Sequence, residues 1–146
     1  MARIFSQEDG NLNTRSIVTS RTKDYTDIDL TFENKPSGDV YKKTDAAAVK
    51  QAVKNLLMTN FAEKPFQPFY GGDLNRFMFE LSEDFDEEDM EDRITSALLA
   101  YEPRALLRSV RVTLAPDYNT VYAKINFQVK STLEEVEQTL TLTRLR

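Results

Sequence analysis

The chain has 146 residues, of which 40% are hydrophobic and 29% charged, and its formal net charge is −5, a composition typical of one soluble globular domain. Cys, His and Trp are absent, which excludes zinc sites built on Cys or His, disulfides, and Ser-His-Asp or Cys-His catalysis. No apolar run approaches the roughly 20 residues that span a membrane, and no dense basic face of the kind that binds nucleic acid is evident.

Residues 1–26 are polar and lack sustained periodicity. They predict an N-terminal arm, which is either frayed or becomes ordered on a partner. The start of the chain also lacks the apolar core of a signal peptide, so synthesis in the cytoplasm is expected. Residues 27–146 are expected to form the folded domain.

The first predicted strand covers Asp27 to Phe32, where Ile28, Leu30 and Phe32 alternate with polar residues. This alternation predicts a half-buried strand with one apolar face. The residues from Asn34 to Gly38 have the composition of a turn and should end the strand.

The first predicted helix begins at Thr44 or Asp45, either of which is a suitable N-cap, and ends at residues 58–60. Apolar residues recur in it at helical spacing and predict a buried stripe: Val49, Ala52, Val53, Leu56 and Leu57. Three polar residues should face solvent: Lys50, Gln51 and Lys54.

A proline-rich loop follows, from Glu63 to Leu74. Its Gly71-Gly72 pair permits a backbone turn that other residues resist, but the spacing matches no phosphate-binding loop. Asp73 is expected to cap a short helix whose apolar residues are Leu74, Phe77, Met78 and Leu81.

The next helix has a clear start at Asp86 as N-cap, with Phe85 and Met90 spaced as a hydrophobic staple. Eight acids and no base lie within residues 83–92. The first turn of a helix favours negative charge, so much of this cluster indicates a helix start and a solvated face. The predicted buried stripe is Met90, Ile94, Ala97, Leu98 and Tyr101.

The helix ends at Tyr101-Glu102-Pro103-Arg104. Proline cannot continue a helix and favours extended geometry in the residue before it. Glu102 and Arg104 are therefore expected side by side, as an acid–base pair at a rigid corner. Taken alone, these residues indicate a helix stop with a weak, outward-facing surface pair.

The end of the chain alternates with a period of two and predicts an antiparallel meander of strands at residues 110–114, 121–129 and 136–142. The last strand has no charge between Gln138 and Thr143. It is either internal to a sheet or an edge that accepts a partner strand. The predicted fold class is α+β: a single domain with about three helices on a small, mainly antiparallel sheet that ends in the meander.

Two motifs in this order resemble the baseplate wedge and sheath-initiator proteins of contractile-tailed phages, a family that includes a baseplate component of type VI secretion systems. The first motif comprises Lys64, Pro65, Phe66, Pro68, Tyr70, Gly71, Asp73 and Leu74, followed by Phe79-Glu80. The second is Tyr101-Glu102-Pro103-Arg104. The resemblance covers roughly residues 25–144, and the arm and the second glycine, Gly72, depart from it.

The resemblance implies a structural virion protein of the tail baseplate, assembled in the host cytoplasm. Glu102, Pro103 and Arg104 would contact a helical bundle of neighbouring wedge proteins. The C-terminal strands would face the tail sheath and initiate its strand exchange; their implied sheath-facing residues are Val121, Ile125, Phe127, Val129, Leu140 and Leu142. Central hub or tube proteins are further implied partners.

No cofactor, metal, nucleic acid or membrane partner is expected, and no catalytic residue. The alternative function is a lysozyme-like glycosidase, because some members of the family carry that label. Its candidate acids would be Glu63, Glu80 and Glu102, but nothing in the sequence pairs two carboxylates across a cleft. At the wedge contact, Arg104→Ala is expected to leave the monomer folded and to block assembly.

Overall fold

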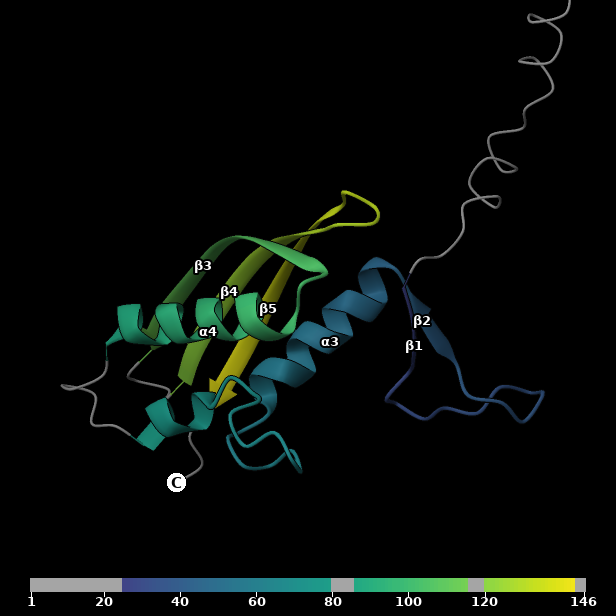
Figure 1. The fold of residues 1–146 in the computed structure, drawn as a ribbon, viewed down its shortest axis with the longest axis horizontal. Coiled ribbons are helices and arrows are strands. Elements are labelled where there is room, and N and C mark those ends of the chain that lie inside the picture. The colour runs from purple at the N-terminus through teal and green to yellow at the C-terminus, as the bar shows by residue number, and fades with distance from the viewer. Residues whose placement is uncertain (1–24, 80–85, 116–119, 144–146) are drawn as a thin grey trace, which may run out of the picture.

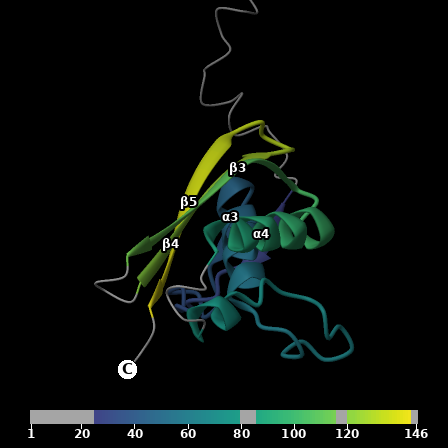
Figure 2. The ribbon, with the colours of Figure 1, turned by 90° about the vertical axis from the view of Figure 1, so that its left-hand side faces the viewer.

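A computed structural model describes residues 25–79, 86–115 and 120–143. Most of the predicted arm, together with Glu80, Leu81 and Phe85, lies outside the described residues. The fold has two layers: a three-stranded sheet, and two helices that cover one of its faces (Figures 1 and 2). This arrangement confirms the predicted α+β class.

The sheet consists of β3 (Ala105–Ala115), β4 (Thr120–Val129) and β5 (Glu135–Thr143). The strands pair antiparallel in the order β3-β4-β5, with Ala123 opposite both Val112 and Leu140. The predicted meander is therefore confirmed. β3 begins five residues earlier than the alternation indicated, directly after Arg104, and contains an irregularity between Leu107 and Ser109.

Helix α3 (Ala46–Met58) confirms the first predicted helix. The expected side-chain cap is wrong, because Asp45 makes no capping hydrogen bond. Gln51 is also not solvated: its Nε2 donates to the Ile28 carbonyl at 2.8 Å, and its Oε1 accepts from the Leu30 N–H at 3.3 Å. A buried amide thus ties α3 to the segment that precedes it.

Helix α4 (Glu87–Tyr101) begins as predicted, since the Asp86 side chain accepts a hydrogen bond from the Glu88 N–H at 2.9 Å. Met90, Ile94, Ala97 and Leu98 of the predicted stripe are buried. Tyr101 is not buried with them, because it is 38% exposed.

The predicted strand from Asp27 to Phe32 is wrong beyond its first residues. Only β1 (Thr26–Ile28) is extended, and it pairs antiparallel with β2 (Lys42–Thr44) in a separate hairpin. The Asp29 side chain accepts from the Thr31 N–H at 3.1 Å and turns the chain, so the apolar residues that follow are exposed. The expected turn is present, with Gly38 at φ +81°.

The loop after α3 leads into the short 3-10 helix η1 (Leu74–Phe79). Leu74 is buried, whereas Phe77 and Met78 pack against the edge of the core. The Asp73 carboxylate accepts from the Phe61 N–H at 3.4 Å, so it joins two parts of the loop. Among the described residues, no helix is long and apolar enough to cross a membrane.

Candidate protein-interaction sites

The corner after α4 is a tight turn and not the extended stretch that we expected. The Ala105 N–H donates to the Glu102 carbonyl at 3.2 Å, which closes a four-residue turn. Pro103 occupies the second position of this turn, where its fixed φ is favourable. The turn passes directly into β3, so the corner is fixed at both ends.

Glu102 does not face outward, which corrects the orientation expected from the sequence. Its side chain is 7% exposed, and its two carboxylate oxygens accept from Arg104 Nε at 2.6 Å and Nη2 at 2.9 Å. The hydrogen bond to Glu102 raises the pKa of Arg104 above its ordinary value. Arg104 is 32% exposed and lies over the Tyr25 ring. The pair therefore closes the corner internally, and the accessible parts of the corner are Pro103 and portions of Tyr101 and Arg104.

The proline-rich loop packs against this corner, so the two sequence motifs meet in space. The Tyr101 hydroxyl donates to the Phe69 carbonyl at 3.0 Å, and the Tyr70 and Tyr101 rings lie 5.1 Å apart. The Lys64 ammonium lies 3.8 Å from the centre of the Tyr70 ring. Burial raises the pKa of Tyr70, and the Glu102 carboxylate adds to this effect. We call this assembly the aromatic corner: the loop 61–73 together with residues 101–104.

Both glycines of the loop allow a close backbone approach to the end of α3. A Cβ on Gly71, which has φ +127°, would lie 2.3 Å from the Thr59 carbonyl oxygen. A Cβ on Gly72 would lie 2.7 Å from the Leu57 carbonyl oxygen. Gly72, which departs from the family motif, is therefore required by the packing against α3.

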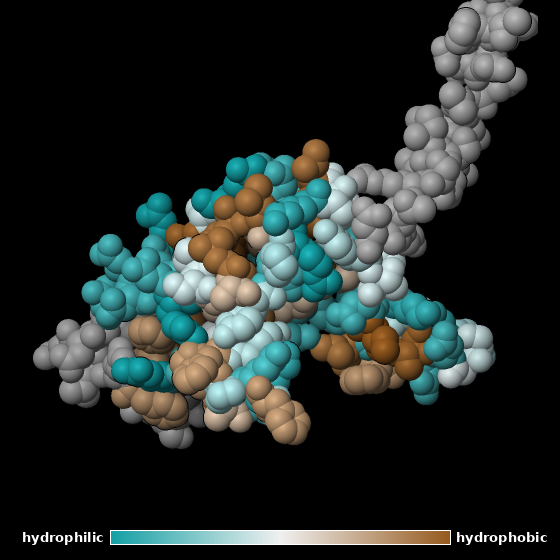
Figure 3. Space-filling view, in the orientation of Figure 1, coloured by the Kyte–Doolittle hydropathy of each residue, from teal (hydrophilic) through white to brown (hydrophobic). Residues whose placement is uncertain are grey.

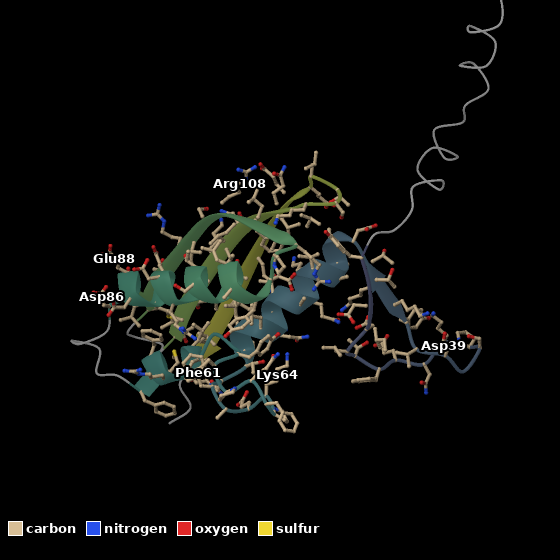
Figure 4. The ribbon with its side chains drawn as sticks, viewed as in Figure 1. Asp39, Phe61, Lys64, Asp86, Glu88 and Arg108 are labelled. Carbon is tan, nitrogen blue, oxygen red and sulfur yellow. The ribbon has the colours of Figure 1, made fainter. Side chains whose placement is uncertain are left out.

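Arg93 of α4 also fixes the loop, a role that no pattern in the sequence indicates. It donates to the Gly72 carbonyl from Nε and to the Gly71 carbonyl from Nη2, both at 3.0 Å. Its guanidinium lies 4.3 Å from the centre of the Phe61 ring. Figure 4 shows Phe61 and Lys64 together on the loop side of the helices, far from Asp39 at the tip of the hairpin.

The fixed loop presents apolar side chains to solvent. Phe66 is 102% exposed at φ +64°, and Phe69 is 72% exposed. Pro65, Pro68 and Pro103 are exposed as well. Figure 3 shows apolar atoms gathered over this side of the molecule. A rigid loop with exposed aromatic rings has the features of a protein-binding surface, because buried aromatic anchors supply much of the energy of interfaces.

The two edges of the sheet differ. At the β3 edge, Glu91 Oε1 accepts from the Val112 N–H at 2.7 Å, and Glu87 Oε1 accepts from the Leu114 N–H at 2.8 Å. Two acids of the cluster thus occupy backbone donors that a further strand would need. Within the described parts of the chain, β5 pairs only with β4, so it is an edge strand and not internal.

The backbone groups at the open edge can be assigned from the ladder. Alternate residues of a strand direct their backbone groups to opposite edges. The Val112 N–H points away from β4, so the pairing register directs the backbone groups of Leu140 and Leu142 toward β4. Thr139, Thr141 and Thr143 then direct theirs outward.

The six residues implied as sheath-facing do not present their side chains to a partner. They are at most 5% exposed and form the core beneath the helices: Val121, Ile125, Phe127, Val129, Leu140 and Leu142. These apolar residues alternate with polar ones along β4 and β5 because every second side chain points into the core. Recognition of a partner by these strands would therefore use the backbone of β5 and not these side chains.

Two of the three candidate acids of the alternative function, Glu63 and Glu102, are poorly suited to catalysis. Glu63 accepts from the Asn60 N–H at 2.8 Å, and this hydrogen bond lowers the pKa of the carboxyl, whereas a general acid needs a raised pKa. Glu102 is held by Arg104, and Glu80 lies outside the described residues.

A rigid aromatic corner and one open sheet edge are features of a subunit that acts within a protein assembly. A family model described as "Baseplate wedge protein gp25" matches residues 43–135. The match covers more than half of the chain, which therefore belongs to this family of baseplate structural proteins. The chain is 29% identical over 114 residues to the baseplate wedge protein gp25 of Enterobacteria phage T4, covering 78% of this chain and 86% of that protein.

Solved structures share the fold. A chain of the anti-feeding prophage baseplate matches with a TM-score of 0.56 at 22% identity, over 80% of this chain and 83% of that one. A Geobacter sulfurreducens protein, described as a candidate tail lysozyme, matches with a TM-score of 0.59 at 19% identity, over 67% of this chain and 89% of that one. Membership of the family gives the chain a place in a virion tail, with other baseplate proteins as partners.

Proposed function

We propose that this chain is a non-enzymatic wedge subunit that links the inner baseplate to the tail sheath and initiates sheath assembly. The observation that carries the proposal is a difference between the two sheet edges in the described part of the chain: side chains of α4 occupy the Val112 and Leu114 N–H groups of β3, whereas β5 pairs only with β4. The aromatic corner is a second, separate surface on the same rigid fold. Two surfaces allow one subunit to hold two kinds of neighbour.

The aromatic corner would bind the helical bundle of neighbouring wedge proteins. Phe66, Phe69 and Pro103 are exposed there, and the loop is already held in one conformation. A preformed loop loses little conformational entropy when it binds. Glu102 supports this surface from within, because its contact with Arg104 fixes the turn that presents Pro103.

The corner is tested by adding a charge at its exposed position. Pro103→Glu should leave the monomer folded, because the second position of a common β-turn needs only a φ near −60°, which most residues adopt. The variant should fail to co-purify with co-expressed baseplate wedge proteins, whereas Lys42→Glu on the hairpin should co-purify normally. Normal assembly of Pro103→Glu would exclude the corner as the wedge contact.

The β5 edge would add a strand of the first ring of sheath subunits. The Thr141 N–H is directed away from β4, so Thr141→Pro should remove a donor for the partner without breaking the ladder with β4. We expect this variant to fold, to enter the baseplate, and to stop sheath polymerisation. Thr141→Val keeps the N–H and serves as the control. Sheath growth on Thr141→Pro baseplates would overturn this role.

The subunit would act in the virion tail after assembly in the host cytoplasm, and its further partners would be central hub or tube proteins. Catalysis has no part in this role, because Glu63 and Glu102 both serve local structure. A turbidity assay on peptidoglycan decides the point. Lysis by the purified protein that is lost in a Glu→Gln variant would establish the glycosidase alternative.

A further inference from the structure

One face of α3 borders the space beside the open edge of β5. Figure 1 shows α3 alongside β5 on the side away from β4, and Figure 2 shows α3 in the helical layer. Residues of α3 spaced three and four apart line a hollow of about 440 Å³, with Gln138 of β5 at its other side: Ala47, Lys50, Gln51, Lys54 and Asn55. A strand added to β5 would pass this hollow.

The hollow has an excess of positive charge. Lys50 and Lys54 are exposed, and within the described chain neither forms an ion pair. The Asp29 carboxylate also lines the hollow but is already paired with Lys43 at 3.0 Å. Gln138 is 5% exposed, and its Oε1 has no hydrogen-bond partner among the described residues.

A second hollow, of about 320 Å³, lies at the other end of β5. Met58, the last residue of α3, lines it together with Met78, Phe79 and Leu142. Met58 follows Lys54 by four residues, so the two side chains lie on one face of the helix. The same face of α3 is therefore basic beside Gln138 and apolar beside Leu142.

We propose that these two hollows select the side chains of a partner strand that is added to β5. An added strand continues the pleat of the sheet, so every second side chain would lie on the face that Gln138, Leu140 and Leu142 share. The partner carries an acidic side chain opposite Gln138 and an apolar side chain opposite Leu142. These positions are four residues apart, or about 13 Å. Lys50 and Lys54 determine specificity for the acid, and Met58 for the apolar residue.

This inference rests on the proposed function, since it names the chemistry of the strand that the β5 edge accepts. A second copy of β5 does not carry the acidic residue that this proposal requires opposite Gln138. The residues that it would offer to the hollows are Val136, Gln138, Leu140 and Leu142, and none of them is acidic. A strand from another protein is therefore the occupant that the charge of the hollow favours.

A tethered strand tests the rule without the natural partner. The full chain is extended after Arg146 by a flexible Gly-Ser linker of about ten residues, which gives a high effective concentration. An eight-residue strand follows, with Leu and then Glu four residues later, the order that antiparallel addition requires. A second version carries Lys in place of Glu.

The readout is the amide exchange rate of Thr139 and Thr141. The tethered strand that carries Glu should slow this exchange about tenfold more than the strand that carries Lys. Lys50 and Lys54 attract the Glu side chain but repel the Lys side chain. In the variant Lys50→Glu/Lys54→Glu the preference should reverse, and in Lys42→Glu it should persist. Equal exchange with both strands, or no slowing with either, would overturn the inference.

Further outcomes keep this result separate from the proposed function. If the tethered strand follows the charge rule but baseplates carrying Thr141→Pro still grow sheath, the specificity stands and the sheath role fails. If sheath growth depends on Thr141 but the charge rule is absent, the sheath role stands and the inference fails. Concentration-dependent dimers of the unextended chain, with slowed Thr139 exchange, would identify a second copy as the occupant and contradict the rule.

Discussion

Glu102 and Arg104 are two residues apart, and the turn between them brings their side chains into a two-point contact at 2.6 and 2.9 Å. Such a contact has better geometry than most surface ion pairs, because the guanidinium matches the carboxylate. Burial of Glu102 also changes what a substitution means. A variant that removes Arg104 leaves a buried carboxylate without its donor, so it perturbs the fold as well as any interface.

Arg104→Ala is therefore expected to lower the free energy of unfolding by about 1–3 kcal/mol, the cost of an unsatisfied buried charge that is partly reached by water. This adds a stability cost to the expectation that the variant leaves the monomer folded and blocks assembly. Urea unfolding measures the effect. Arg108→Ala, at an exposed arginine bonded to Gln128, should cost no more than about 0.5 kcal/mol. Equal stability of the two variants would contradict this role for the pair.

The pKa of Glu63 gives a prediction about pH. Its hydrogen bond from the Asn60 N–H lowers the pKa in the folded state. A lowered folded pKa contributes stability above the unfolded value of about 4.3, and that stability is lost as the pH falls through the folded value. In an NMR titration, the chemical shift of the Asn60 amide should change with pH, with a midpoint below about pH 4.3. This change should be absent in Glu63→Gln. A midpoint above the ordinary value would instead suit a general acid.

At the scale of elements, the loop 61–73 depends on close packing against the end of α3. Gly71 and Gly72 approach the Thr59 and Leu57 carbonyl oxygens so closely that a side chain at either position would collide with backbone. Arg93 and Tyr101 then hold the carbonyl groups of the loop. Contacts from both helices thus hold the loop.

Substitution of either glycine tests this packing. Gly71→Ala should destabilise by at least about 2 kcal/mol, because it adds backbone strain to a clash. Gly72→Ala should be destabilising through the clash alone. Gly38→Ala is the control, since its φ is also positive but nothing lies within 4 Å of the added atom, and it should cost about 1 kcal/mol. Thermal unfolding of the three variants should rank them in that order.

The closed edge of β3 gives another prediction at this scale. Glu91→Ala removes the acceptor of the Val112 N–H, which should cost about 1–2 kcal/mol and expose an edge that other chains can pair with. Analytical ultracentrifugation should detect self-association. Glu88→Ala, at the exposed start of α4, should remain monomeric. A monomeric Glu91→Ala variant of unchanged stability would show that α4 does not protect this edge.

Local patterns in the sequence predicted much of the molecule. The Asp86 cap of α4 and the alternation of the meander depend on neighbours along the chain and were confirmed. The stripe of α3 was confirmed except at Ala52, which is only half-buried. Contacts between distant segments were not predictable in this way. Gln51 has the composition of a solvated helix position but is buried by β1. Ile28 and Leu30 alternate like a strand, yet the Asp29 side chain turns the chain between Ile28 and Phe32.

The candidate sites were likewise predictable where they depend on local sequence and not where they depend on contacts between distant segments. The sequence identified the two motifs, and the structure brings them together through Tyr70 and Tyr101. The sequence alone could not show that Glu102 is buried, or that the alternating residues of β4 and β5 belong to the core. The roles of Glu87 and Glu91 at the β3 edge arise only when α4 packs beside that strand.

At the scale of the whole molecule, the fold separates two surfaces on one rigid support. The aromatic corner lies where the chain passes from α4 into β3, and the open edge lies two strands away on β5. Glu91 and Glu87 occupy the Val112 and Leu114 N–H groups at the β3 edge, so within the described residues β5 is the edge of this sheet that is left for strand addition. Such directionality would suit a subunit that starts an ordered polymer, because the polymer can then grow on one defined side.

The most direct test compares amide exchange in the free protein and in assembled tails. We predict that the Thr139 and Thr141 amides exchange rapidly in the free protein and become protected in the tail, whereas the Val112 amide is protected in both by Glu91. If Thr139 and Thr141 exchange as rapidly in the assembled tail as in the free protein, no strand is added at β5, and the proposed role in sheath initiation is wrong.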